Sequence, residues 1–300
     1  SAGEHKHGLF RRIMLTVIEF YIYVWDFFFT AECASQVKLH DKTVVITGGN
    51  TGIGKETALD LAARGVMACP KSKTEDGLET HFGVNHLGHF LLTNLLLDRM
   101  KASAPARIVN VSSALYFIGK IYFDDINLDR GYNRLLAYGN SKLANILFTR
   151  ELAKRLEGTG VTAYCLHPGV IDTELARYLN SVALGIIEFL RVTFRRSILK
   201  RPRQGAQTTI YCAVDKIIAQ ESGLYYCACR SVEPLRKATD DVSAEKLWKF
   251  SEHLTNAHKF LPTAPASWRS NVPFSENQKK GMENDVVHNA LVTVSRKSVQ

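Results

Sequence analysis

Apolar runs and amphipathic segments alternate along the middle of the chain. Short runs rich in β-branched and apolar residues predict strands at residues 43–47, 107–112, 161–166 and 224–227. Apolar residues that recur every three to four positions predict helices at residues 52–64, 86–100, 138–156 and 244–254. Strands that alternate with helices are typical of an α/β fold, in which helices cover both faces of a doubly wound parallel sheet.

The segments that flank this region follow other patterns. Residues 13–31 form an apolar stretch about long enough to span a bilayer, but Glu19 and Asp26 interrupt it and share one side of a helix. We therefore expect residues 1–38 to contain a membrane anchor, either a marginal span or an interfacial helix, with a buried core helix as the alternative. The tail, 259–300, has no sustained period and is predicted to be mostly disordered.

Basic residues outnumber acidic ones. Lys and Arg total 38 and Asp and Glu total 29, and the net charge of +9 favours an anionic partner. Six of the basic residues lie within 191–203, which contains no acid and follows the apolar stretch 182–190. This combination is more typical of a membrane-surface element than of a nucleic-acid-binding stripe. We expect no nucleic-acid partner and a second membrane contact at 182–203, with a solvated helix end as the alternative.

Composition excludes several classes of protein. A hydrophobic content of 46% excludes a wholly disordered chain. The six cysteines include no C-x-x-C pair, which excludes a zinc ribbon and a thioredoxin-like site. Hydrolase and kinase readings lack support, because the sequence contains neither G-x-S-x-G nor a P-loop. We predict no metal site and interpret four histidines as solvated or core residues: His81, His86, His89 and His167.

A glycine-rich loop joins the first predicted strand to the first predicted helix. It reads Thr47-Gly48-Gly49-Asn50-Thr51-Gly52-Ile53-Gly54. Glycines let the backbone turn sharply and let a pyrophosphate approach the helix N-terminus, where free N–H groups favour negative charge. In this position between a strand and a helix, the loop predicts a dinucleotide site, with a plain structural turn as the alternative.

Three further motifs follow the glycine loop in the chain. Asn85 lies in V-N-H-L-G-H-F, Ser113 ends N-V-S-S, and Tyr138 and Lys142 form a Y-x-x-x-K pair. Together with the T-G-x-x-x-G-x-G spacing of the loop, these motifs resemble those of the short-chain dehydrogenase/reductase superfamily. Over residues 39–254 the details of the motifs look like those of its microsomal retinol dehydrogenase/retinal reductase branch.

This resemblance implies a Rossmann-like catalytic domain at 39–258 that interconverts a lipophilic alcohol and its aldehyde or ketone, retinol and retinal being the examples. It implies NADP(H) as cofactor, with NAD as the alternative, and attachment to the endoplasmic reticulum membrane; it leaves the oligomeric state open. The implied catalytic residues are Tyr138, Lys142, Ser113 and Asn85. The implied cofactor-binding residues are Gly48, Asn50, Thr51, Gly52, Ile53, Gly54, Lys55, Tyr138, Lys142, Pro168, Gly169 and Thr173.

The implied roles are chemically reasonable. A phenol with an ordinary pKa near 10 is a poor proton shuttle at neutral pH, but a lysine four residues on shares its helix face and stabilises the phenolate. Tyr138 would exchange a proton with the substrate oxygen, Ser113 would orient the carbonyl, and Asn85 would position a water in the proton relay. Lys142 would also hold the nicotinamide ribose, and the nicotinamide itself transfers the hydride.

A second Y-x-x-x-K pair, Tyr116 and Lys120, competes with the first. It lies just past a predicted strand and contains Gly119, so no helix is expected to align its two side chains. Tyr138 and Lys142 lie instead in a strongly periodic helix. We therefore assign the proton-transfer role to Tyr138.

The chain is too short between its first strand and its serine-bearing strand. Only 41 residues separate Gly65 from Arg107, whereas the superfamily places three strands and their helices there. The sequence therefore looks internally deleted at Gly65/Val66, with strands 2 to 4 apparently missing. The resemblance places the fourth strand between the first strand and the serine-bearing one, so we expect 43–47 and 107–112 to pair directly if the sheet closes. The alternative function is a catalytically inactive, membrane-associated relative that binds cofactor poorly.

Overall fold

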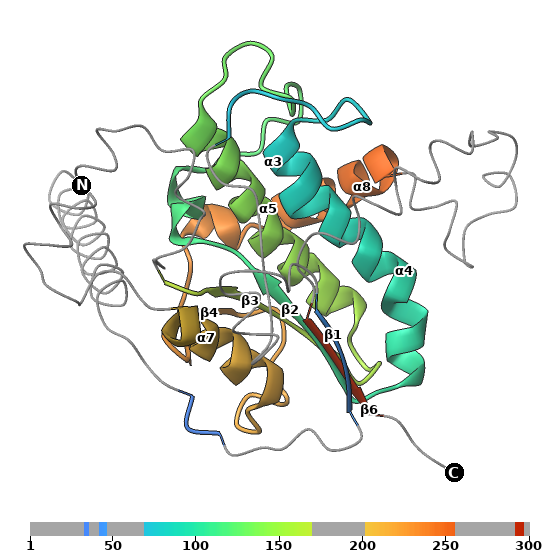
Figure 1. Cartoon of the computed structure of the whole chain (residues 1–300). Helices are drawn as coiled ribbons and strands as arrows, with labels where there is room; N and C mark the ends of the chain where they lie inside the picture. The colour runs from blue at the N-terminus through green and yellow to red at the C-terminus, as the bar shows by residue number, and fades with distance from the viewer. Residues whose placement is uncertain (1–32, 36–41, 47–68, 170–201, 256–291, 297–300) are drawn as a thin grey trace, which may run out of the picture.

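The computed structural model describes residues 33–35, 42–46, 69–169, 202–255 and 292–296 (Figure 1). The apolar segment 13–31 and most of the basic segment 182–203 lie outside these residues. Within the described part of the chain, no helix has both the length and the apolar character needed to cross a membrane.

Six strands form one sheet in the order β1-β6-β2-β3-β4-β5. The central strands β2, β3 and β4 are parallel to one another, as predicted, whereas β5 is antiparallel to β4. The sequence-predicted strands match β1, β2, β3 and β4 within one or two residues. The strands are β1 (Lys42–Ile46), β2 (Ala106–Val111), β3 (Val161–His167), β4 (Tyr225–Cys227), β5 (Arg230–Ser231) and β6 (Val292–Arg296).

Helices cover both faces of the sheet (Figure 1). Two of them, α5 and α8, begin a few residues before their predicted starts, and the predicted helix 86–100 is divided between a π-helical turn and α4. The predicted helix 52–64 lies outside the described residues. The helices are α3 (Thr80–Phe82), α4 (Gly88–Ala102), α5 (Arg134–Arg155), α7 (Pro202–Val214) and α8 (Asp241–Thr255), with a π-helix η1 (Gly83–Leu87) and 3-10 turns η2 (Ala114–Ile118) and η4 (Arg236–Ala238).

Alternate residues of β2 face opposite helical layers. Ile108 packs in a cluster with α4, α5 and α8, whereas Val109 packs in a cluster with α7. Successive side chains of a strand point to opposite faces, so a strand covered on both sides must be apolar at nearly every position. The sequence of β2 satisfies this requirement, because its one interior polar residue, Asn110, donates a hydrogen bond to the Thr149 hydroxyl at 2.9 Å.

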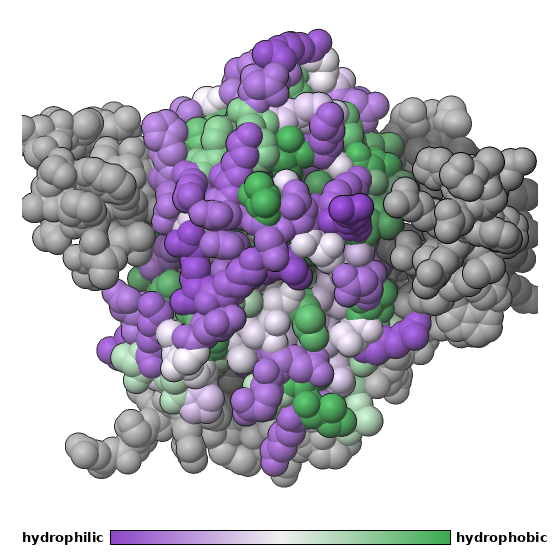
Figure 2. All heavy atoms as spheres, turned by 180° about the vertical axis from the view of Figure 1, so that it is seen from behind, coloured by the Kyte–Doolittle hydropathy of each residue, from purple (hydrophilic) through white to green (hydrophobic). Residues whose placement is uncertain are grey.

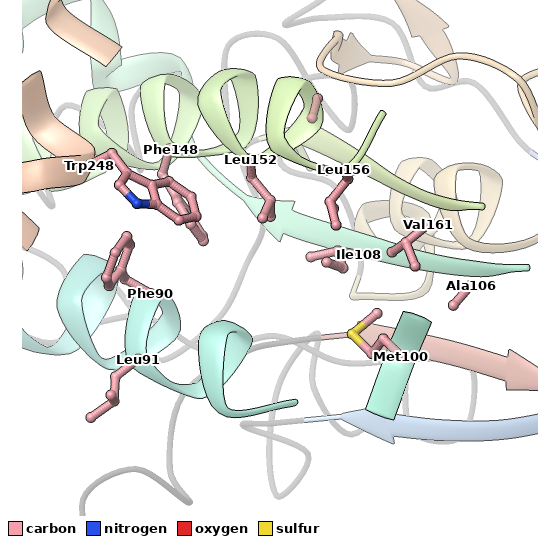
Figure 3. Close-up of a cluster of buried hydrophobic side chains, with 12 residues drawn as sticks. Phe90, Leu91, Met100, Ala106, Ile108, Phe148, Leu152, Leu156, Val161 and Trp248 are labelled. Atoms are coloured by element: carbon pink, nitrogen blue, oxygen red, sulfur yellow. The ribbon is translucent and has the colours of Figure 1, made fainter. Parts of the chain in front are cut away.

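An aromatic group joins the three helices on one face of the sheet (Figure 3). Phe90 of α4, Phe148 of α5 and Trp248 of α8 have ring centroids 4.9 to 5.8 Å apart. Rings at such distances combine large buried area with favourable edge contacts. The neighbouring Leu152 is fully buried in the same cluster, between α5 and β2.

The outer surface has a different character. Figure 2 shows hydrophilic side chains over much of the rear face, with hydrophobic ones scattered among them. Large apolar side chains that are exposed, such as Leu95 on α4, are separate exceptions of a kind common on protein surfaces.

The strand β6 lies between β1 and β2 and is antiparallel to both. The expectation that β1 and β2 would pair directly is therefore wrong. Buried backbone N–H and C=O groups need hydrogen-bonding partners, and β6 supplies them to the edge of β2 opposite β3. The tail that we expected to be mostly disordered thus contributes five residues to the sheet.

The core predicts a sharp contrast between two helical leucines. Leu152→Ala should lower the free energy of unfolding by about 2–5 kcal/mol, because it removes apolar contacts and leaves a cavity. Leu95→Ala is the matched control, since this leucine is 47% exposed, and its effect should stay within about 0.5 kcal/mol. Urea denaturation of the two variants provides the measurement. Equal losses of stability would contradict the assignment of the core.

Candidate active site

The helix α5 carries a polar row along an otherwise apolar buried face. Asn133 caps its N-terminus, its side-chain oxygen accepting from the N–H groups of Leu135 and Leu136 at 3.0 and 3.1 Å. Tyr138 and Lys142 follow four residues apart on the face that meets β2 and are both at least 95% buried. The helix thus holds two ionisable groups in the interior.

Ser113, Tyr138 and Lys142 come together at the carboxyl end of β2. Ser113 is the second residue after this strand, and its side chain forms a hydrogen bond with Tyr138. The Lys142 ammonium lies 5.5 Å from the centre of the Tyr138 ring and donates a hydrogen bond to the Val111 carbonyl at 3.1 Å. The structure therefore brings together three of the four predicted catalytic side chains, Tyr138 and Lys142 buried and Ser113 half-buried.

Burial sets the protonation of this group in the unliganded chain. Removal from water raises the pKa of Tyr138 to about 12, although the hydrogen bond from Ser113 acts in the opposite direction. Burial likewise lowers the pKa of Lys142 to about 8, and the neighbouring Cys165 side chain acts in the opposite direction. At neutral pH the phenol is therefore neutral and the ammonium is still mostly protonated, a charge beside the phenol that favours release of its proton.

Asn85 lies in the π-helical turn that precedes α4. Its side-chain amide donates to the Ser141 hydroxyl at 3.0 Å, and this hydroxyl donates to the Tyr138 carbonyl at 2.7 Å. Short π-helical turns are frequent at functional sites, because they change the direction of a side chain within a helix. The fourth predicted catalytic residue is thus connected to α5 at Ser141, the residue before Lys142.

Apart from Tyr138 and Lys142 on α5, the predicted cofactor-binding residues that the structure describes lie just after β3. Pro168 and Gly169 follow the carboxyl end of this strand, and Gly169 has a φ of 92°, a conformation that favours glycine. The predicted loop residues Gly48, Asn50, Thr51, Gly52, Ile53, Gly54 and Lys55, as well as Thr173, lie outside the described residues.

Tyr116, the tyrosine of the competing pair, has a structural environment. Its ring is buried edge-on against Tyr225 with a centroid distance of 5.5 Å, and its hydroxyl accepts from the Leu235 N–H at 2.9 Å. Lys120 is exposed, and its ammonium lies over the ring of Tyr122 at 5.1 Å. Tyr116 and Lys120 thus contact different residues, whereas Lys142 lies over the ring of the tyrosine of its own pair.

Several polar contacts around the site have no motif in the sequence. The Asn145 amide shares the Val111 carbonyl with Lys142 at 3.3 Å, and the Ser112 hydroxyl donates to the Lys142 carbonyl at 2.8 Å. His167 accepts the Ala114 N–H at 3.2 Å, which fixes the turn after Ser113. The spacing of Asn145, seven residues after Tyr138 on the same helix face, was the available signal.

Two of the histidines have strongly perturbed environments. Burial is the largest influence on His81 and lowers its pKa, but hydrogen bonds from Cys69 and Glu79 outweigh it and raise the pKa to about 9. The Nδ1 atom of His81 lies 2.7 Å from the Glu79 carboxylate. Burial lowers the pKa of His86 to about 3, and its Nε2 lies 2.8 Å from the Ser251 hydroxyl. Both are core residues, and the part of the chain in view contains no group of three metal-ligating side chains.

The sequence of this chain is similar to those of known proteins. Residues 68–183 match the family described as short chain dehydrogenase. Human retinol dehydrogenase 12 is 42% identical over 289 positions, which cover 75% of this chain and 90% of that protein. The chain belongs to the short-chain dehydrogenase/reductase superfamily. Within this superfamily it falls in the retinol dehydrogenase branch.

Two further similar proteins align over different lengths. Mouse retinol dehydrogenase 14 is 53% identical over 200 positions, which cover 66% of this chain and 59% of that protein. A crystal structure of an uncharacterized protein from Mycobacterium paratuberculosis is 35% identical, covers 64% of each chain and has a TM-score of 0.49.

The buried His86 predicts a loss of stability in acid. Its pKa in the folded chain is lower than the ordinary 6.5, so the stability it contributes is complete above pH 6.5 and is lost as pH falls toward 3. Each pH unit below 6.5 should cost about 1.4 kcal/mol through this group. Between pH 6.5 and pH 5, the free energy of unfolding of His86→Phe should therefore fall by about 2 kcal/mol less than that of the unaltered chain.

Urea denaturation across this pH range measures the effect. His253→Gln is the control, because His253 is exposed on α8, and its pH dependence should match that of the unaltered chain. A His86→Phe variant with the same acid sensitivity as the unaltered chain would contradict the prediction.

Proposed function

We propose that this chain is an NADP(H)-dependent oxidoreductase that interconverts a lipophilic alcohol, such as retinol, and its aldehyde or ketone. The observation that carries the proposal is the group formed by the half-buried Ser113 and the buried Tyr138 and Lys142 at the carboxyl end of β2. The retinol dehydrogenases that align with the chain support the choice of substrate class.

Each side chain has a distinct task in this proposal. The Ser113 hydroxyl orients the substrate oxygen, and the Tyr138 phenol donates a proton to it in reduction or accepts one in oxidation. Lys142 holds a positive charge beside the phenol and stabilises the phenolate. Asn85, through Ser141, keeps α5 in place and positions a water in the proton relay. When bound, the nicotinamide supplies or accepts the hydride.

The described residues fit a dinucleotide at its nicotinamide end. Lys142 and Tyr138 provide donors for ribose hydroxyls at the carboxyl end of β2, and Gly169, just after β3, adds no side chain there. Ligands of doubly wound sheets bind at this edge. The glycine loop that follows β1 would hold the pyrophosphate, and Lys55 is its candidate partner for the NADP phosphate.

Membrane attachment belongs to the same proposal. The apolar residues 13–31 and the basic residues 182–203 would place the site near a bilayer, which is where a lipophilic substrate dissolves. The resemblance to the microsomal retinol dehydrogenase branch favours the endoplasmic reticulum membrane as the site of attachment.

An inactive relative is the second candidate function. The alignment with retinol dehydrogenase 12 has 289 positions but covers only 75% of this 300-residue chain, or about 225 residues. About 60 positions of the alignment therefore have no counterpart in this chain. The alignment with retinol dehydrogenase 14 is nearly free of such gaps, since 66% of the chain fills almost all of its 200 positions. These values support an internal deletion of about two strand–helix units. The deletion would remove walls of the adenosine pocket.

Activity should depend on Tyr138 and not on Tyr116. Tyr138→Phe removes the proton donor and should lower NADPH-dependent reduction of retinal by about 10²–10⁴-fold. Tyr116→Phe is the matched control, because Tyr116 is also buried and its hydroxyl accepts the Leu235 N–H, a contact away from Lys142. Steady-state assays of purified variants compare the two. Loss of activity in Tyr116→Phe with retention in Tyr138→Phe would overturn the assignment.

Cofactor affinity separates the two candidate functions. We expect the 300-residue chain to bind NADPH more weakly than micromolar, because β6 occupies the position of the superfamily's fourth strand. Calorimetric titration with NADPH and NADH measures the affinity, and a thermal scan confirms that the sample is folded. Micromolar binding to a cooperatively folded chain would show that the deletion is tolerated. If the folded chain binds neither NADPH nor NADH, the inactive relative is favoured.

A further inference from the structure

The segment that carries Ser113 is a short loop. We name residues 113–120 the serine loop; it contains η2 and ends at Lys120. Within it, the Leu115 N–H donates to the Ser113 hydroxyl at 3.2 Å, the Tyr116 N–H donates to the Ser113 carbonyl at 3.1 Å, and the Gly119 N–H donates to the Tyr116 carbonyl at 2.9 Å. These bonds join residues of the loop to one another and not to α5, so the position of Ser113 relative to Tyr138 depends on the surroundings of the loop.

One side of the serine loop rests on α5 through two glycines. A Cβ atom added to Gly119 would lie 2.3 Å from the Gly139 carbonyl oxygen, and one added to Gly139 would lie 2.7 Å from the Leu115 carbonyl oxygen. Only glycines allow this approach of backbone to backbone. The Asn140 side chain strengthens it by accepting the Lys120 N–H at 2.8 Å. Gly139, the residue after Tyr138, thereby blocks movement of the loop toward α5.

The opposite side of the loop is held from η4, before α8. The Lys237 ammonium donates to the carbonyl of Phe117 at 2.6 Å and to that of Gly119 at 2.7 Å. These carbonyls lie in and just after the last turn of η2, where carbonyls have no partner within a helix. An ammonium has three donors and suits two adjacent carbonyls. The Leu235 N–H, two residues earlier, reaches the Tyr116 hydroxyl.

The element that presents Lys237 is itself fixed. Ala238, the next residue, is 99% buried in the cluster that contains Leu143 and Leu147 of α5. The ammonium therefore reaches the serine loop from a segment that packs against α5, the helix that carries Tyr138 and Lys142. Helix, loop and η4 form a closed set of contacts around Ser113.

We propose that Lys237 is a positioning residue for the reaction: its two hydrogen bonds press the serine loop onto α5 and so keep the Ser113 hydroxyl against Tyr138. This proposal rests on the proposed function of Ser113 and Tyr138. Lys237 touches neither substrate nor cofactor in it. Without the ammonium, two carbonyls lose their donor and the loop can move away from Gly139. A displacement of about 1 Å in a catalytic group is enough to slow a reaction by one to two orders of magnitude.

Hydrogen exchange of the cofactor-free chain tests the contacts. Lys237→Met should speed exchange of the amides of residues 115–120, whereas Lys237→Arg, which can donate to both carbonyls, should restore their protection. Lys249→Met is the matched control, because Lys249 on α8 is exposed and pairs only with Glu245 at 2.6 Å. Unchanged exchange of residues 115–120 in Lys237→Met would overturn the proposal. This measurement decides on Lys237 even if the unaltered chain reduces no aldehyde, a result that would contradict the proposed function alone.

Steady-state kinetics tests the positioning role. Lys237→Met should lower kcat for retinal reduction about tenfold and change KM less than about twofold, with an unchanged midpoint of thermal unfolding. Lys237→Arg should recover kcat. A parallel fall in kcat and in the unfolding midpoint, without recovery by arginine, would mean that Lys237 only stabilises the fold.

Discussion

A strand that is buried on both faces must find backbone partners along both of its edges, and β2 is such a strand. Its parallel pairing with β3 runs from Ala106 to Val111 and satisfies one edge. The other edge pairs with β6 over Arg107, Ile108 and Val109. Because unpaired buried N–H and C=O groups cost about 1–3 kcal/mol each, the whole sheet depends on both edges being filled.

The catalytic group inherits its geometry from this strand. The Val111 carbonyl, at the end of β2, accepts from both Lys142 and Asn145, and Ser112 returns a hydrogen bond to the Lys142 carbonyl. The helix α5 is thereby attached to the strand at the place where Ser113 begins the following loop. A shift of β2 along the sheet would move Ser113 and Tyr138 by different amounts, because Ser113 lies two residues after the strand whereas Tyr138 lies on α5.

Sequence reasoning succeeded where signals were local. The position of α5 followed from its apolar period, and the shared helix face of Tyr138 and Lys142 followed from their four-residue spacing. The grouping of Ser113 with them was implied by the family resemblance of the motifs. The sequence contains no comparable signal for β6, because Val292–Arg296 is a single short run in a polar tail and acquires a partner only through β1 and β2, far away in the chain. The contacts of Glu79 with His81 and of Lys237 with the serine loop were equally out of reach, since they depend on how loops pack.

The place of β6 also bears on when the fold can form. Lys42 pairs with Arg296, so the sheet joins residues 254 positions apart in the sequence. Contacts between residues so distant in sequence form slowly, because a very long loop must close before any of them exists. During synthesis, the helices and strands between residues 69 and 255 are complete before the last strand leaves the ribosome. Until then the edge of β2 that receives β6 is open to any other strand it meets, which makes the newly made chain vulnerable to aggregation.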